Sequence, residues 1–191
     1  METGHRIMKR FLLLPILTLA VFAQAKPDPA EAGPKIIAEA FAKLSGALAE
    51  AIGKSGPAGA LSVCSEMAPQ IAKEVATTHG VTLRRATTKP RNPKNAADNA
   101  EKAVLEVYAA ALAKKEAPKP QVITNADGSR AFLAPIVLGN PLCLQCHGTP
   151  NQDIAPETLA AIQKLYPDDK ATGFKLGDLR GLWRVTFPNS K

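Results

Sequence analysis

The five residues Cys143-Leu144-Gln145-Cys146-His147 constrain this chain more than any other feature of its sequence. The spacing C-x-x-C-H is the attachment sequence of haem c, in which two thiols add across the two vinyl groups of a porphyrin. The histidine after the second cysteine then lies under the iron. We therefore expect the chain to fold around one covalently bound haem c, with Cys143 and Cys146 as its thioether residues and His147 as the proximal axial ligand.

Two other uses of this cysteine pair are open to such a sequence. A thioredoxin-type redox pair is also C-x-x-C, but it follows a strand at the start of a helix in a βαβ unit, and it leaves the histidine unexplained. A structural zinc site needs four ligands. Outside the motif the sequence offers Cys64, His79 and acidic residues, with no second C-x-x-C pair, so haem attachment is the favoured interpretation.

The first 25 residues have the layout of a secretory signal peptide. Lys9 and Arg10 precede an apolar run from Phe11 to Phe22, and Ala23-Gln24-Ala25 fits the small-x-small cleavage rule. The run is shorter than the roughly 20 residues of a membrane span, which argues against an uncleaved anchor. We expect residues 1–25 to be a signal peptide, the mature chain to contain no membrane span, and the protein to be periplasmic or otherwise exported from a bacterium, where haem c is attached.

The charge of the chain does not indicate a nucleic-acid partner. The formal net charge of +7 falls to +5 without residues 1–25, which hold three basic residues and one acidic residue. The densest basic stretch, residues 84–94, contains no aromatic residue on which a base could stack. We interpret the positive net charge as a feature that favours solubility and that supplies basic side chains to pair with acidic groups of a ligand.

The order of apolar patterns predicts an α+β domain. Residues 26–35 are rich in proline and alanine and are expected to form a flexible leader, so the haem-binding domain spans residues 36–191. Helical spacing predicts three helices, and a fourth short helix is expected from about Pro156. Residues 84–97 are expected to form an ordered loop or an extended stretch. A β-hairpin and a closing strand follow from alternating patterns. The elements concerned are residues 36–52, 58–78 and 98–115 for the three helices, 121–124 with 130–138 for the hairpin, and 181–187 for the last strand.

The residues alone leave the distal axial ligand open. After removal of the signal peptide, Met67 is the one methionine, and Cys64 and His79 are the other candidates. A free cysteine is most often a small buried hydrophobe. An exported protein with an odd cysteine nevertheless needs an explanation, and a thiolate ligand would supply one.

Several segments, in order along the chain, resemble those of haem c domains with a PAS-like fold. These domains occur as free-standing exported proteins and as extracytoplasmic sensor regions of histidine kinases and chemoreceptors. The resemblance covers residues 36–188 and lies in the segments Val63-Cys64-Ser65-Glu66, Arg91-Asn92-Pro93, Cys143-Leu144-Gln145-Cys146-His147-Gly148, Tyr166-Pro167-Asp168-Asp169 and Gly177-Asp178-Leu179-Arg180-Gly181.

This resemblance implies a PAS-like antiparallel sheet flanked by N-terminal and connecting helices. It also implies a haem with both axial positions filled, by His147 on the proximal side and by Cys64 on the distal side. The segment with Arg91 and Asn92 matches an arginine-containing stretch of the family, which makes these two residues candidates for contacts with the haem propionates.

Two functions follow from such a haem. The first is a redox or diatomic-gas sensor, in which CO or NO displaces Cys64 after reduction. The alternative is a periplasmic electron-transfer cytochrome c in which neither ligand leaves. The sequence shows no separate acid–base pair or nucleophile motif, and a haem with two axial ligands has no open site, so an enzyme is not expected. The sequence names neither the redox or signalling partner nor the oligomeric state, and a homodimer through the N-terminal helices is left open.

Overall fold

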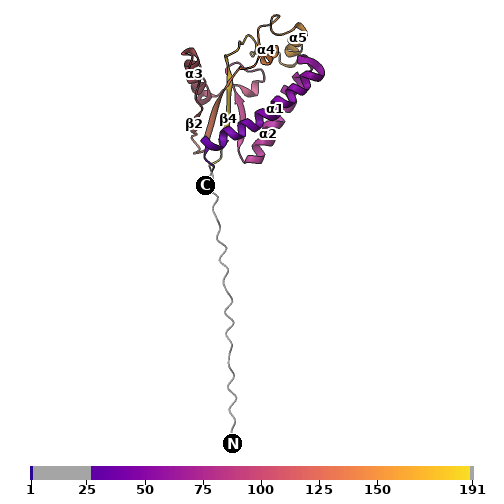
Figure 1. The fold of residues 1–191 in the computed structure, drawn as a ribbon. Coiled ribbons are helices and arrows are strands. Elements are labelled where there is room, and N and C mark those ends of the chain that lie inside the picture. Colours follow the sequence, from indigo (N-terminus) through magenta and orange to yellow (C-terminus); the bar gives the residue numbers. More distant parts are fainter. Residues whose placement is uncertain (2–26, 190–191) are drawn as a thin grey trace.

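The structure is a computed structural model that describes Met1 and residues 27–189. Apart from Met1, the predicted signal peptide therefore lies outside the described residues. The described part contains one antiparallel sheet in the order β1-β4-β3-β2, with helices on both sides of it (Figure 1). The strands are β1 Thr82–Ala86, β2 Gln121–Thr124, β3 Arg130–Val137 and β4 Leu179–Phe187. The predicted α+β class with an antiparallel sheet is confirmed.

The two faces of the sheet bury different side chains because residues alternate along a strand. On β4, Leu182 packs towards helix α3, Asn99–Ala113. Trp183 and Val185 pack on the other face, towards helices α1, Pro29–Gly59, and α2, Ala68–His79. The predicted hairpin is present, and Gly128 adopts φ 79° in its turn. The sheet is thus a central layer with a separate apolar core on each face.

Helix α1, Pro29–Gly59, begins earlier than the sequence pattern indicated. The expected flexible leader over residues 26–35 is wrong from Pro29 onwards. Asp28 caps the helix by accepting a hydrogen bond from the Ala30 amide, and Pro29 occupies a position in the first turn where proline costs no hydrogen bond. Pro29 and Gly33 are buried, and Ala32 packs against the cluster that contains Phe132, so tertiary contacts stabilise this early start.

The chain changes direction and helical register between α1 and helix α2, Ala68–His79. Gly56, with φ 66°, breaks α1 where the glycine and proline residues predicted an end. A π-helical segment η1, Val63–Met67, follows, and its wider hydrogen bond runs from the Ala68 amide to the Val63 carbonyl. Pro69 has no amide to donate, so a change of register just before it is the expected response. The helix expected over residues 58–78, which Pro69 was expected to kink or reset, is therefore divided between η1 and α2.

Helix α3 begins and ends close to its predicted bounds of 98 and 115. Asp98 and Glu101 form a capping box, in which each side chain accepts a hydrogen bond from the other's backbone amide. Tyr108 is fully buried and donates a hydrogen bond from its hydroxyl to the Leu133 carbonyl, 2.9 Å away. These contacts fix α3 on its face of the sheet.

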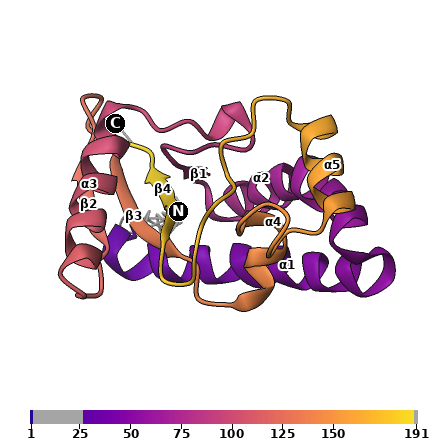
Figure 2. The same ribbon diagram turned by 90° about the horizontal axis from the view of Figure 1, so that it is seen from above.

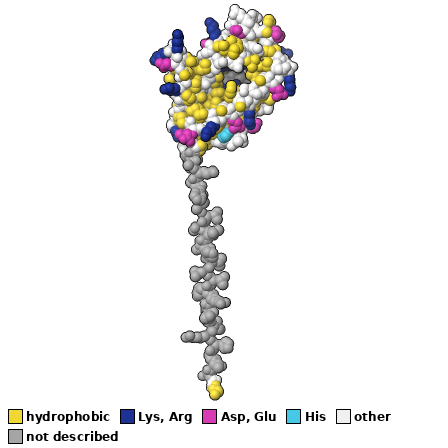
Figure 3. Space-filling view, in the orientation of Figure 1, with side chains coloured by type: hydrophobic (Ala, Val, Ile, Leu, Met, Phe, Trp, Pro, Cys, Tyr) yellow, Lys and Arg dark blue, Asp and Glu magenta, His cyan; other side chains and the backbone are white. Residues whose placement is uncertain are grey.

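The remaining elements gather at one end of the sheet, beside the end of α1 (Figure 2). They are the 3-10 turns η2 Pro93–Asn95 and η3 Pro141–Cys143 and the helices α4 Leu144–His147 and α5 Pro156–Leu165. Residues 84–86, expected to be part of an ordered loop or an extended stretch, are extended and belong to β1, which pairs with β4. Space-filling shows hydrophobic side chains gathered on the visible face around a hollow (Figure 3). No helix among residues 27–189 has the length and apolar character needed to cross a membrane.

Two glycines of α1 test how closely this helix packs on the sheet. A Cβ at Gly33 would overlap the Phe132 ring and lie 2.7 Å from the Phe132 Cβ, whereas a Cβ at Gly46 would meet nothing within 4 Å. We expect Gly33→Ala to lower the free energy of unfolding by about 1–3 kcal/mol. Gly46→Ala should raise it by about 0.5–1 kcal/mol, because helix-interior glycine is costly. Urea unfolding measures both, and equal effects would contradict this packing.

Candidate functional site

The C-x-x-C-H segment lies on a tight helical stretch made by η3 and α4. Asn140 begins it by accepting a hydrogen bond from the Leu142 amide at 2.9 Å. Cys143 packs against the apolar cluster of Leu138, Ala171 and Phe174, and Cys146 packs against that of Leu61, Ile154 and Ile162. Both cysteines are partly buried free thiols. One turn of helix therefore holds two available sulfur atoms between two apolar clusters.

His147 is held in the protonation state that suits a metal ligand. Its Nδ1 lies 2.8 Å from the Ala171 carbonyl oxygen. A carbonyl only accepts, so Nδ1 carries the proton and Nε2 keeps its lone pair. Burial, and then the positive charges of Arg180, Arg91 and Arg85, lower the pKa of His147 to about 3. The imidazole is neutral at physiological pH, as iron coordination requires.

Arg91 ties the motif to the loop that carries Ala171. Its Nε and Nη2 donate to the Asp169 carboxylate at 3.0 and 3.2 Å, and Nη2 also donates to the Cys146 carbonyl at 2.7 Å. The side chains of Arg91 and Asp169 are only 6% and 8% exposed. A longer bond of 3.4 Å reaches the Ala171 carbonyl, the same oxygen that accepts from His147. Arg91 thus fixes both the motif and the partner of its histidine.

Asn92, the other residue predicted to contact propionates, has a local role in the structure. Its Oδ1 accepts a hydrogen bond from the Lys94 amide at 3.0 Å and so caps η2. It also lines a pocket with Cys64. Arg91 has a compensating carboxylate in Asp169, and only its Nη1 is buried without a partner among the described residues. The assignment of propionate contacts to Arg91 and Asn92 stays a prediction.

Cys64 lies in the π-helical segment η1 and is partly buried. Burial raises the pKa of the Cys64 thiol, and the positive charges of Arg85, Arg91 and Arg180 oppose that rise. The same three arginines act on His147, and negative charge on Cys64 would raise the pKa of the Cys146 thiol. Leu61, three residues before Cys64, also packs in the cluster that contains Cys146. The structure therefore brings Cys64 to the same region as the motif.

The other two candidates for a distal ligand differ from Cys64 in exposure or in position. Met67 is 44% exposed. His79 ends α2, a helix of 12 residues and so about 18 Å long, at the end away from Cys64. Its Nε2 lies 2.8 Å from the Glu39 carboxylate. Within the described residues no group of three or more His, Cys, Asp or Glu side chains is arranged to hold a metal ion by itself.

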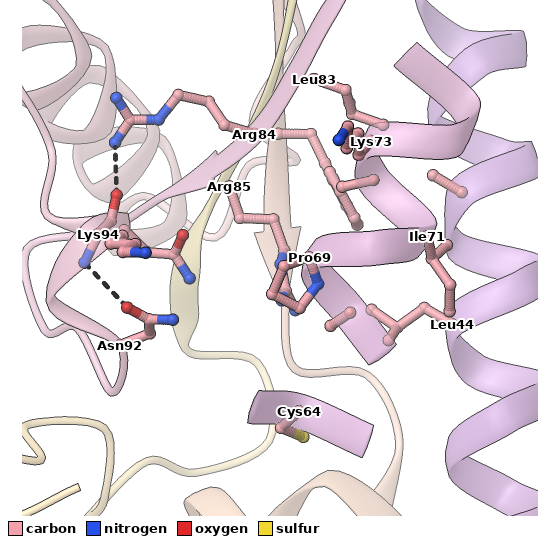
Figure 4. Close-up of a pocket in the computed structure, with 15 residues that line it drawn as sticks. Leu44, Cys64, Pro69, Ile71, Lys73, Leu83, Arg84, Arg85, Asn92 and Lys94 are labelled. Atoms are coloured by element: carbon pink, nitrogen blue, oxygen red, sulfur yellow. Dashed lines mark hydrogen bonds between the residues drawn. The ribbon is translucent and has the colours of Figure 1, made fainter. Parts of the chain in front are cut away.

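A pocket of about 410 Å³ lies between β1, α1 and α2, with Cys64 and Arg85 in its lining. Figure 4 shows that Arg84 and Arg85, neighbours on β1, point in different directions. Arg84 donates to the Lys94 and Ala96 carbonyls. Arg85 extends along the pocket, and its guanidinium carbon lies 5.6 Å from the centre of the Trp183 ring. The volume is in the range of small-molecule and cofactor sites.

The sequence predicted no role for four residues of this site, although two of them, Asp169 and Arg180, stand in segments that carry the family resemblance. The four residues are Arg85, Asp169, Ala171 and Arg180. Arg180 lies over the Phe174 ring, 5.4 Å from its centre, and Phe174 in turn meets His147 edge to face with ring centres 6.4 Å apart. If a strand had been predicted over residues 82–86, the alternation of its side chains would have placed Arg84 and Arg85 on opposite faces of the sheet. No local pattern indicated the other three.

Comparison with known proteins identifies the family. A family model described as Tll0287-like matches residues 20–188. The solved crystal structure of the cyanobacterial heme-protein Tll0287 is similar, with a TM-score of 0.66 and 26% sequence identity, over 86% of this chain and 99% of that one. No curated protein matches. Because the family model spans well over half of the sequence, this chain belongs to the Tll0287-like family.

Proposed function

We propose that this protein is an exported mono-haem c protein that acts as a redox or diatomic-gas sensor, with His147 and Cys64 as its two axial ligands. The observation that carries the proposal is the state of His147. Its Nδ1 is committed to the Ala171 carbonyl, its Nε2 is left to coordinate, and two free thiols lie on the same turn. The description of the similar solved structure as a heme-protein supports the same cofactor.

The residues present fit this cofactor. Cys143 and Cys146 would hold it by thioether bonds, and apolar clusters on both sides of them would exclude water. Buried Nη1 of Arg91 and Nε of Arg180 have no partner within the described residues, as expected where an anionic group belongs. When bound, haem c supplies a one-electron iron couple and a metal centre that takes up CO or NO.

The position of Cys64 favours a sensor over an electron carrier. It lies in a π-helical turn between two α-helical segments, and such turns are frequent at functional sites because their hydrogen bonds can change register. Movement of this turn would let Cys64 leave the haem iron and return to it. Such a change would give the two-state element that a sensor needs. An electron carrier would instead keep Cys64 in place in both redox states. A PAS-like fold, a periplasmic location and a redox or signalling partner are part of this proposal.

Covalent attachment is the first test. Co-expression with a cytochrome c maturation system should give a pigment that acid–acetone does not extract, because two thioether bonds retain it. A Cys143→Ala/Cys146→Ala variant should lose the pigment or release it. Cys64→Ala is the matched control, since it removes the third cysteine and should leave the pigment covalent. A wild-type pigment that extracts freely would overturn the proposal.

A further inference from the structure

Three arginines with only one carboxylate between them occupy the region around the two axial candidates. Arg91 is neutralised by Asp169. Arg85 and Arg180 form no ion pair with any residue among those the structure describes. Two guanidinium charges are therefore left without a counter-charge in a largely buried region. Such charges are costly unless something of opposite sign is present.

The geometry shows two separate cationic groups. Arg85 lies at Trp183 on the face of the sheet that carries α1 and α2, and it lines the same pocket as Cys64. Arg180 lies over Phe174, which contacts His147. Its Nη1 donates to Thr87 Oγ1 at 3.2 Å and to the Lys89 carbonyl at 3.1 Å, but its Nε is buried without a partner. An arginine that forms no ion pair among the described residues thus lies near each axial candidate, and Lys89 also lies over Phe174, 5.2 Å from its centre.

We propose that Arg85 and Arg180 bind the two propionate carboxylates of the haem. The inference rests on the proposed function and names the residues that neutralise its cofactor. Two ionised propionates carry a charge of −2, which matches the two unpaired guanidinium groups. The fork of N–H donors on arginine suits a carboxylate, and Arg180 Nε is such a donor. Arg91 is less suited to this role because Asp169 already neutralises its charge, and only its Nη1 lacks a partner among the described residues.

The effect of the arginines on one another supports this assignment. Burial, followed by repulsion from Arg91 and Arg85, lowers the pKa of Arg180 to about 10. The repulsion is present in the chain without its cofactor and would be relieved by an anionic ligand. Haem should therefore stabilise the chain more when both arginines are present than when either one is replaced by an uncharged residue.

The test compares the melting temperatures of the haem-loaded and haem-free forms of each variant. The haem-free form carries Cys143→Ala/Cys146→Ala. We expect Arg85→Gln and Arg180→Gln each to reduce the difference between the two forms by roughly 3 °C or more. The difference cancels structural losses common to both forms, such as the Arg180 bond to Thr87. Arg84→Gln is the matched control, because Arg84 is the neighbour of Arg85 on β1 and pairs instead with Glu101.

Resonance Raman spectroscopy of the loaded protein gives a second readout. The propionate bending bands should shift in Arg85→Gln and Arg180→Gln and remain in place in Arg84→Gln. Arg85→Lys and Arg180→Lys retain the positive charge and should recover part of the stabilisation by haem. They replace the glutamine variants in this comparison if a glutamine variant does not fold. Unchanged stabilisation and unchanged bands in both glutamine variants, with a covalent pigment, would overturn this inference alone. Absence of a covalent pigment in the wild type would overturn the proposed function instead.

Discussion

Replacing Cys64 by serine is expected to abolish the low-spin thiolate signal of the ferric protein in electron paramagnetic resonance. The reduction potential should rise by on the order of 100 mV or more, since axial ligands move haem potentials over roughly 0.8 V. A thiolate donates electron density and favours the ferric state, so its loss favours reduction. Redox titration of the purified protein measures the shift. Cys64→Met should also raise the potential, towards that of a His/Met cytochrome.

The matched controls for Cys64 are the two other candidates for the distal position. Met67→Ala removes an exposed side chain in the same π-helical segment, and His79→Ala removes a ring that contacts Glu39. Neither should change the spectrum or the potential. If either variant changes both while Cys64→Ser changes neither, the thiolate assignment is wrong.

Binding of carbon monoxide distinguishes the sensor function from the electron-transfer function, and it can be measured on the same wild-type and Cys64→Ser proteins. The reduced wild type should bind CO readily if Cys64 is released on reduction, and the absorption spectrum reports this directly. The Cys64→Ser protein should bind CO in the same way, because its distal position is already weakly held. A reduced wild type that excludes CO, while Cys64→Ser binds it, would favour the electron-transfer function.

Breaking the buried pair of Arg91 and Asp169 should have the largest effect on stability. We expect Arg91→Ala to lower the free energy of unfolding by about 3–5 kcal/mol, because Asp169 would stay buried without its partner. The variant also loses the bonds to the Cys146 and Ala171 carbonyls. Urea unfolding of the haem-free chain measures this loss without any contribution from the cofactor.

An exposed ion pair provides the comparison. Lys54 and Glu50 form a pair on α1 with side chains 71% and 66% exposed, and Lys54→Ala should change the unfolding free energy by less than about 1 kcal/mol. Asp169→Asn keeps the shape of the side chain and removes its charge, so it should also destabilise the chain. Equal losses for Arg91→Ala and Lys54→Ala would show that Arg91 does not hold the motif in place.

Local signals in the sequence were sufficient where neighbouring residues decide the structure. The capping box of Asp98 and Glu101, the turn at Gly128 and the helix end at Gly80 all depend on residues a few positions apart. The same holds for the C-x-x-C-H motif, whose cysteines lie on one turn because of their spacing. The early start of α1 also depends on neighbours, because Asp28 caps the helix and Pro29 lies in its first turn, and the expected leader over residues 26–35 did not include this start.

Contacts between distant parts of the chain could not be predicted in this way. Residues 84–86 looked like part of a basic loop or extended stretch, and they form a strand because β4, about a hundred residues later, supplies their hydrogen-bond partners. That pairing puts Arg85 and Arg84 on opposite faces. The side chain of Arg91 could equally have met a ligand or a protein carboxylate, and only the fold brings Asp169 to it, 78 residues along the chain.

The sequence by itself thus predicted the two cysteines that would attach the cofactor and the histidine that would be its proximal ligand, since covalent attachment depends on the spacing between neighbours, and it left the distal ligand open. The tertiary structure decided which carbonyl orients His147, which carboxylate neutralises Arg91, and which arginines form no ion pair within residues 27–189. The physical reason is that the energy of a buried charge depends on every group within a few ångströms, and folding brings those groups together from segments that lie far apart in the sequence.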